Sequence, residues 1–165
     1  MKYLSDSEAT GAMRWIAEAA NVAKRALCLK AKCGSIIVKN GTVIGEGYNA
    51  PPLDDMKNSF CLTPYNHTGK PRYDHTCCMH AEWRAILDTL RNNPDKIQDS
   101  TLYFARIDAE KNLTRCGEPL CTVCSRLALD SGVKEFVLLH EQGVCVYPTD
   151  EYNQLSYDYV SPEFR

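Results

Sequence analysis

Residues 77–86 read CCMHAEWRAI and bring two adjacent thiols, one imidazole and one carboxylate close together in the chain. Apolar side chains then recur at helical spacing until residues 92–94 (NNP), which are typical of a helix end. We therefore predict a helix from about His80 to Leu90. Two residues along a helix differ by about 200° in direction, so His80 and Glu82 are not expected to bind one metal ion as equivalent ligands.

Two further cysteines, Cys121 and Cys124, lie three positions apart at the start of CTVCSRLALDSGV, which reads as a helix closed by Gly132. In the first turn of a helix this spacing places both sulfur atoms on one side. The free backbone amides of that turn also favour the thiolate form, which is the form that binds zinc. The spacing predicts one metal ion bound by both cysteines, with His80 as the best candidate for a third ligand.

Two cysteines and one histidine leave one tetrahedral position of zinc open for water, which distinguishes a catalytic zinc from a closed structural one. Zinc lowers the pKa of a bound water toward neutrality, and Glu82 at the helix entry is placed to take its proton and return it to a leaving nitrogen. Such a site suits attack of hydroxide on an electron-poor ring carbon that carries an amino group. The alternative is a structural zinc whose fourth ligand is Cys77, Cys78 or Cys116.

Helical and strand patterns alternate along the rest of the chain. Asn40-Gly41 separates two β-rich runs and is a strong hairpin signal, and only residues 141–143 separate the last two apolar runs, which should pair antiparallel. The expected elements are a helix over 5–28 capped by Ser5 and Glu8, the hairpin over 35–49, the helix at His80, a strand over 101–107, the helix at Cys121, strands over 134–140 and 143–149, and a short amphipathic helix in the tail. This order fits an α/β fold, a three-layer α/β/α sandwich around a five-stranded mixed sheet.

Length and composition favour one domain. The 165 residues, 44% hydrophobic and 24% charged, are enough for one sizeable core and too few for two. Between about residues 50 and 77 the pattern dissolves into prolines, asparagines and glycines, over a length at which loops are usually functional or disordered. We expect a single domain over residues 1–165, with a long loop insertion at about 50–77.

Cysteine content and charge indicate the compartment and the partners. The nine cysteines accompany neither an apolar run of about 20 residues nor a signal-peptide core, so we expect a cytoplasmic protein whose thiols are free or bind metal, rather than a disulfide scaffold. A net charge of -2, a sequence pI of about 6.1 and the lack of a basic cluster argue against nucleic acid as a partner. They favour a small-molecule substrate, and no membrane association is expected.

The two motifs together are typical of one group of enzymes. H-x-E followed by P-C-x-x-C is the signature of zinc-dependent nucleobase deaminases. This chain has HAE at residues 80–82 and PLCTVC at 119–124, with Leu120 inserted where the signature places proline directly before the first cysteine. On these motifs and on the order of its elements, the chain resembles the cytidine and deoxycytidylate deaminase superfamily over roughly residues 7–147.

The resemblance implies a zinc cofactor and specific site residues. It implies that Glu82 is the proton shuttle, that Asn49 hydrogen-bonds the sugar or base of the substrate, and that the Ala81 backbone amide faces the ring carbonyl. The zinc ligands that it implies are His80, Cys121 and Cys124. It also implies a homo-oligomer whose neighbouring subunits complete the site.

The implied activity is hydrolytic deamination of a cytosine nucleotide or nucleoside, such as dCMP or cytidine, to the uracil product with release of ammonia. Such an enzyme would serve nucleotide metabolism or pyrimidine salvage. One alternative is a deaminase of another aminated heterocycle such as guanine, because the metal chemistry is the same and only the shape of the pocket differs. Another is a non-catalytic, zinc-stabilised binding module, for which the departure at Leu120 is the only support in the sequence.

The long loop carries further candidate ligands. Some deoxycytidylate deaminases place a second, structural zinc in the corresponding region, and this chain has thiols and imidazoles there. Solvated histidines and buried thiols are the alternative explanation, because the spacing among these residues is not tight. The candidate residues are Cys61, His67, His75, Cys77 and Cys78.

Two weaker signals concern substrate contacts. Lys57, Lys70 and Arg72 in the loop are candidates to receive a substrate phosphate, and scattered surface charges are the simpler explanation for them. Trp83 is a candidate to stack on a flat base, and packing within the protein is its alternative role.

Overall fold

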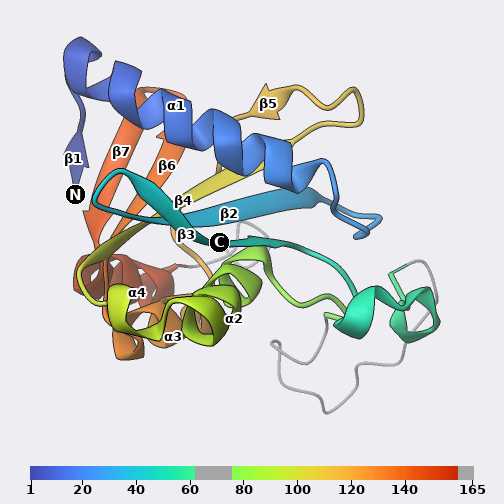
Figure 1. Ribbon diagram of the computed structural model, residues 1–165. Helices are drawn as coiled ribbons and strands as arrows, with labels where there is room; N and C mark the ends of the chain where they lie inside the picture. The colour runs from blue at the N-terminus through green and yellow to red at the C-terminus, as the bar shows by residue number, and fades with distance from the viewer. Residues whose placement is uncertain (62–75, 160–165) are drawn as a thin grey trace.

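The computed structural model describes residues 1–61 and 76–159, and these form a mixed β-sheet covered by helices on both faces (Figure 1). The strands are β1 (Lys2–Tyr3), β2 (Lys32–Lys39), β3 (Thr42–Tyr48), β4 (Ser100–Ile107), β5 (Leu113–Thr114), β6 (Val133–His140) and β7 (Gly143–Pro148). The helices are α1 (Asp6–Ala23), α2 (Ala81–Asn92), α3 (Thr122–Asp130) and α4 (Thr149–Asp158), with single 3-10 turns at η1 (Pro52–Asp54), η2 (Met56–Asn58) and η4 (Pro94–Lys96).

The sheet is mixed, as predicted, but has seven strands rather than five. Its order is β1-β7-β6-β4-β2-β3, with β5 paired to β4. Among the strands of the described residues, only β4 and β6 run parallel, and α3 lies in the crossover that a parallel pair requires. The five long strands are the five that were expected. The two additional strands, β1 and β5, have two residues each, which is too short to show an alternating pattern in the sequence.

Three layers are present, and the expected sandwich is confirmed. The helix α1 covers one face of the sheet, where Ile16 packs in a core cluster with Ile36 of β2. The helices α2, α3 and α4 cover the other face (Figure 1), where Ile86 and Phe136 belong to a second core cluster. The candidate site residues lie on the side of α2 and α3.

Local sequence signals explain several boundaries. The backbone amide of Ser5 donates to Glu8 Oε2 at 3.0 Å, so the predicted capping pair starts α1. Asn40 (φ 50°) and Gly41 (φ 71°) adopt the left-handed conformation that a two-residue hairpin turn requires, and Lys39 pairs with Thr42 across the turn. The expected β6–β7 hairpin is also antiparallel.

The helix α2 lies unusually close to β3. A Cβ atom added at Gly47 would lie 2.3 Å from the Ala81 carbonyl oxygen and 2.4 Å from the Ala85 nitrogen, so only glycine permits this approach. Ahead of the helix, Ala50 and Met79 exchange backbone hydrogen bonds of 3.3 Å and 2.8 Å. These contacts fix where α2 begins relative to the sheet.

The long loop is described only in part. Its first portion contains η1 and η2, and residues 62–75 lie outside the described residues. The tail predicted as a turn of helix is the ten-residue helix α4. In the two described ranges, no helix has the length and apolar character needed to cross a bilayer.

Candidate metal centre and active-site pocket

Two helix N-termini bring the predicted ligands together. His80 is the residue that caps α2, and Cys121 is the residue that caps α3, with Cys124 buried in the first turn of α3. His80 Nδ1 lies 3.2 Å from Cys124 Sγ and 3.5 Å from Cys121 Sγ, and the two sulfur atoms are 3.0 Å apart. The three donor atoms thus form one compact cluster, as expected from the sequence.

The electrostatics of this cluster favour a thiolate beside an imidazolium. The hydrogen bond from Cys124 lowers the pKa of Cys121 to about 4, with a further contribution from His80. The hydrogen bond to Cys121 raises the pKa of His80 to about 9 against the opposing effect of burial. Burial raises the pKa of Cys124 well above its usual value, so Cys121 carries the negative charge of the pair.

The donor set fits zinc. One imidazole nitrogen and two sulfur atoms, all within 4.8 Å of one another, are the ligands of a Cys2His site. Over residues 1–61 and 76–159, no other His, Cys, Asp or Glu belongs to this group. Cys77 and Cys78 instead lie beside Cys61, so neither fills the fourth position that a closed structural site would need.

Glu82 lies on the first turn of α2 and points inward. Its side chain is only 8% exposed, although a carboxylate at this depth is costly unless it is paired or hydrogen-bonded. Burial raises the pKa of Glu82, and the positive charge of His80 opposes this effect. The carboxyl group lies near the metal-ligating atoms without belonging to their group, and its role in proton transfer stays a prediction.

A cavity of about 280 Å³ opens beside the cluster. Its walls combine the predicted site residues with side chains from β2, β4 and the segment before α3. Besides His80, Glu82 and Cys121, the residues that line it include Asn49, Phe104, Arg106, Cys116, Leu120 and Tyr152. The volume suits a single small ring system with part of its substituent.

Asn49 and Ala81 both line this cavity. The Asn49 side chain accepts a hydrogen bond from the Cys33 backbone amide (2.9 Å) and donates one to the Ala31 carbonyl (2.8 Å). One amide hydrogen and one lone pair of Asn49 remain for a ligand, while the other two hold the start of β2 in place. The roles of Asn49 and Ala81 in substrate binding stay predictions.

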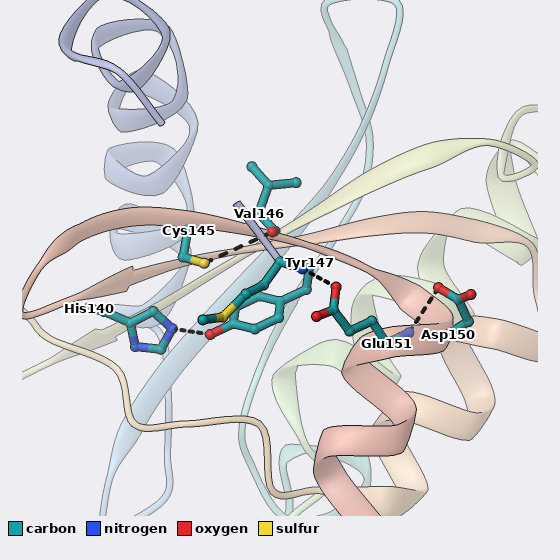
Figure 2. Close-up of polar contacts among 7 residues, drawn as sticks. His140, Cys145, Val146, Tyr147, Asp150 and Glu151 are labelled. Atoms are coloured by element: carbon teal, nitrogen blue, oxygen red, sulfur yellow. Dashed lines mark hydrogen bonds and ion pairs between the residues drawn. The ribbon is translucent and has the colours of Figure 1, made fainter. Parts of the chain in front are cut away.

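The segment before α3 is fixed by a buried pair on β6 and β7. The Tyr147 hydroxyl donates to His140 Nε2 at 2.9 Å (Figure 2), and His140 Nδ1 donates to the Cys116 carbonyl at 3.3 Å. Leu120, the inserted residue before the first cysteine, is 50% exposed and lies at the rim of the cavity. The insertion therefore places an apolar side chain at the entrance and leaves Cys121 in position.

Trp83 packs on a candidate ligand. Its ring stacks on the imidazole of His80, with ring centroids 5.1 Å apart and an interplanar angle of 19°. The stacking restricts rotation of the imidazole about its Cβ–Cγ bond. Of the two roles considered for Trp83, packing within the protein is therefore the one that these contacts support.

A second group of thiols lies near the start of the long loop. Cys28, Cys61 and Cys78 place their sulfur atoms within 4.8 Å of one another, and Cys77 Sγ lies 3.2 Å from Cys61 Sγ. Cys28 was not among the sequence candidates, because it lies beyond the end of α1 in another part of the chain. The remaining two candidates, His67 and His75, lie outside the described residues.

The basic residue that lines the cavity is not one of those proposed from the sequence. Arg106 on β4 lines the cavity, whereas Lys57 lies on η2 and does not, and Lys70 and Arg72 lie outside the described residues. Leu102, Phe104 and Arg106 alternate along β4, so period-two spacing was the available signal that Arg106 lies on the same face of the strand as Phe104, which also lines the cavity.

A family model matches residues 10–140 of the chain. Its description is "Cytidine and deoxycytidylate deaminase zinc-binding region". The match covers the predicted ligands and Glu82, and it includes every strand except β1 and β7.

Two curated relatives are deoxycytidylate deaminases. The protein of Saccharomyces cerevisiae is 34% identical over 118 residues, which is 70% of this chain and 33% of the relative. The protein of Schizosaccharomyces pombe is 28% identical over 125 residues, which is 70% of this chain and 32% of the relative. The chain therefore spans about one third of the length of these relatives.

Two solved structures share the fold. A cytidine deaminase from Burkholderia pseudomallei matches with a TM-score of 0.56 and 18% identity, over 85% of this chain and 94% of that chain. A dCMP deaminase from the cyanophage S-TIM5, in apo form, matches with a TM-score of 0.51 and 19% identity, over 81% and 82% of the two chains. At these identities the similarity concerns the architecture alone.

Proposed function

Because the chain belongs to the cytidine and deoxycytidylate deaminase zinc-binding family, we propose that it catalyses hydrolytic deamination of a cytosine nucleotide or nucleoside. In this reaction water adds to the ring carbon that carries the amino group, ammonia leaves, and the product contains uracil. The observation that carries the proposal is the placement of buried Glu82 beside the His80, Cys121 and Cys124 donors, on the wall of one small cavity.

His80, Cys121 and Cys124 would hold the zinc ion. Zinc bound by these residues supplies a Lewis acid that makes water nucleophilic near neutral pH. Other parts of the chain favour the protonation state and the orientation in which these ligands bind zinc. The amides of the first turn of α3 and the hydrogen bond from Cys124 favour the Cys121 thiolate, and Trp83 fixes the orientation of the His80 ring.

Glu82 would move the protons. Its raised pKa brings the carboxyl group closer to the working pH, where it can both accept a proton and return it. The first transfer takes a proton from the attacking water, and the second delivers it to the departing amino nitrogen. Because the cavity excludes most solvent around the Glu82 side chain, the proton stays with this group between the two transfers.

Asn49 and the Ala81 amide would orient the substrate. Both line the cavity together with Glu82, and one amide hydrogen and one lone pair of Asn49 are available for a substrate. Phe104 and Tyr152 add aromatic surface to the same wall, which suits a flat heterocycle.

Two alternative functions can be distinguished from the proposed one by experiment. Deamination of guanine or another aminated heterocycle would use the same donors. A non-catalytic zinc-stabilised module would require no buried acid beside the metal ligands, and Glu82 is such an acid, so the catalytic proposal has the stronger support. The deciding experiment is an ammonia-release screen of the zinc-loaded protein over cytidine, deoxycytidine, their monophosphates, cytosine, guanine and adenosine. Release only from cytosine compounds is expected, and release only from a purine would contradict the proposal.

The remaining expectations stay predictions. They are a homo-oligomer, a cytoplasmic location and a small-molecule partner rather than nucleic acid. Tyr157 of α4 is 56% exposed and Leu129 of α3 is 43% exposed, which gives this end of the molecule apolar surface suited to a subunit contact.

A further inference from the structure

Tyr152 lines the active-site cavity but belongs to neither sequence motif. It is the fourth residue of α4 and shares the wall of the cavity with Glu82. The family match ends at residue 140, before α4 begins, so it does not include Tyr152. The role of this residue must therefore follow from its own contacts in this chain.

The helix α4 is oriented so that Tyr152 lies on its buried face. The buried residues of α4 recur at spacings of three and four, as expected for one face of a helix, and they are Thr149, Tyr152 and Ser156. Ser125 Oγ of α3 donates to Asn153 Oδ1 of α4 at 2.8 Å. This bond joins the residue after Cys124 to the residue after Tyr152, so it holds the two helices together beside the metal ligands.

Two aromatic neighbours fix the ring of Tyr152. It stacks on the ring of Phe136 of β6, with centroids 4.0 Å apart and an interplanar angle of 8°. The ring of Tyr147 of β7 contacts it edge-on, at 5.7 Å and 85°. Only 6% of Tyr152 is exposed. The position of its hydroxyl group is therefore set before any ligand binds.

The hydroxyl group of Tyr152 makes no hydrogen bond with any residue in the ranges 1–61 and 76–159. Other tyrosine hydroxyls do have partners. Tyr147 donates to His140 Nε2 at 2.9 Å, and Tyr48 donates to Asp54 Oδ2 at 2.6 Å. A hydroxyl group at this depth is costly without a partner, and Tyr152 lines a cavity from which a ligand can supply one.

The hydroxyl group lies close to the reacting groups. Burial raises the pKa of Tyr152 well above its usual value. The largest further contribution comes from the charge of Glu82, followed by those of Cys124 and Cys121. Because such effects weaken with distance, the phenol oxygen lies near these side chains. The amino group of a bound cytosine must also lie near Glu82, since Glu82 is proposed to protonate the leaving nitrogen.

We propose that Tyr152 is a further catalytic residue, whose hydroxyl oxygen accepts a hydrogen bond from the amino group of the cytosine ring. The proposal rests on the proposed function and adds a residue to it. A phenol hydroxyl accepts as well as donates hydrogen bonds. When Glu82 protonates the leaving nitrogen, the N–H groups of this nitrogen become those of a cation and donate a stronger hydrogen bond. The contact therefore stabilises the transition state more than the bound substrate.

The oxygen that attacks the ring is the alternative partner of the Tyr152 hydroxyl group. A pyrimidin-2-one compound separates the two contacts, because it carries hydrogen in place of the amino group and presents the same ring carbon to attack. If Tyr152 contacts the amino group, the affinity for this compound does not depend on the hydroxyl group. If Tyr152 contacts the attacking oxygen, it does.

The test compares Tyr152→Phe with wild type, both loaded with zinc. The substitution keeps the ring that stacks on Phe136 and removes only the hydroxyl group. For deoxycytidine and dCMP, kcat is expected to fall about 10- to 100-fold, while KM rises only about 2- to 5-fold, because the contact strengthens in the transition state. The dissociation constants of the corresponding pyrimidin-2-one compounds should equal those of wild type.

Stability and zinc content are measured in the same variant. Neither should fall, because the hydroxyl group that is removed has no partner in the part of the chain that the structure describes. Tyr157→Phe is the matched control, because Tyr157 is an exposed tyrosine of the same helix and does not line the active-site cavity. It should leave kcat unchanged.

Three results would overturn the proposal while leaving the proposed function standing. They are wild-type kcat in Tyr152→Phe, an equal loss of affinity for the pyrimidin-2-one compounds, and a lower melting temperature that accompanies the loss of activity. The last result would assign the hydroxyl group a structural role.

Binding measured by calorimetry separates this proposal from the proposed function. If wild type releases ammonia from no cytosine compound, the proposed function fails, and the affinities for deoxycytidine and its pyrimidin-2-one counterpart become the readout. A loss of about 2- to 5-fold in Tyr152→Phe for deoxycytidine alone supports the contact with the amino group. Equal affinities for deoxycytidine in the two proteins overturn it.

Discussion

Cys121 Sγ lies 3.5 Å from His80 Nδ1, although the two residues are 41 positions apart in the chain. The contact exists because α2 and α3 lie on the same face of the sheet and present their N-termini to each other. Each of the two helix starts is anchored independently, one by the close packing of Gly47 and the other by the His140–Tyr147 pair. The sheet therefore sets the geometry of the proposed metal centre.

Zinc binding is expected to release protons. In the metal-free protein His80, with its pKa raised to about 9, is protonated at pH 7, and the raised pKa of Cys124 keeps its thiol protonated. Cys121, with its pKa lowered to about 4, is already a thiolate. Zinc requires a neutral imidazole and two thiolates, so about two protons should leave per zinc at pH 7.

Calorimetry in buffers of different ionisation enthalpy measures this number directly. The same pKa values give the direction of the pH dependence. The affinity for zinc should rise as the pH increases from 5 to 8, because protons compete less with zinc for His80 and Cys124. A pH-independent affinity over that range would show that the donors are already deprotonated in the free protein.

Replacing Trp83 with alanine should weaken zinc binding. The substitution removes the ring that stacks on His80 and restores rotational freedom to the imidazole. The expected loss is about 0.5–1.5 kcal/mol, or roughly 2- to 10-fold in the zinc dissociation constant measured by chelator competition. Trp83→Phe, which keeps an aromatic face, should retain most of the affinity. A zinc dissociation constant in Trp83→Ala equal to that of wild type would show that the ring contributes to packing alone.

Alanine at Gly47 should destabilise the fold. The added Cβ would lie 2.3 Å from the Ala81 carbonyl oxygen, which is backbone and must move together with α2. We expect a loss of about 1–3 kcal/mol in the free energy of unfolding, measured by urea denaturation. Gly11→Ala is the control, because Gly11 lies in α1 where an added Cβ atom would have no neighbour within 4 Å, and this substitution should be neutral or stabilising.

The thiol group at Cys28, Cys61 and Cys78 is expected to bind a second, structural metal ion. Metal analysis of the purified protein should then give two zinc ions per chain, and Cys78→Ser should reduce this to one and lower the melting temperature. The control is Cys145→Ala, because Cys145 is buried but belongs to neither metal-ligating group. One zinc ion per chain in wild type would contradict this prediction and would show that these thiols are core residues without a metal ion.

Short-range patterns allowed much of the fold to be predicted. The Ser5–Glu8 cap, the Asn40-Gly41 turn and the cysteine spacing of α3 act within a few residues, so they are visible in the sequence itself. The His80, Cys121 and Cys124 cluster was predicted because both motifs lie at helix starts, where side chains of facing helices can meet.

Long-range pairing explains what the sequence did not reveal. Arg106 lines the active-site cavity because β4 pairs with β2 in a register that sets Arg106 opposite Cys33, and that register is not encoded near either residue. Cys28 joins Cys61 and Cys78 because segments far apart in the chain meet beyond the end of α1. The use of Asn49 to hold the backbone of Ala31 and Cys33 likewise depends on strand pairing.

The most direct test of the account measures zinc content and ammonia release in Glu82→Gln. Glu82 is assigned proton transfer and no metal ligation, so the variant should retain the zinc content of wild type while kcat falls by about 100-fold or more. Glu110→Gln is the control, because Glu110 is an exposed acid in the loop after β4, and this variant should match wild type in both measurements. Loss of zinc from Glu82→Gln, or full activity with zinc retained, would contradict the role of Glu82 and with it the proposed mechanism.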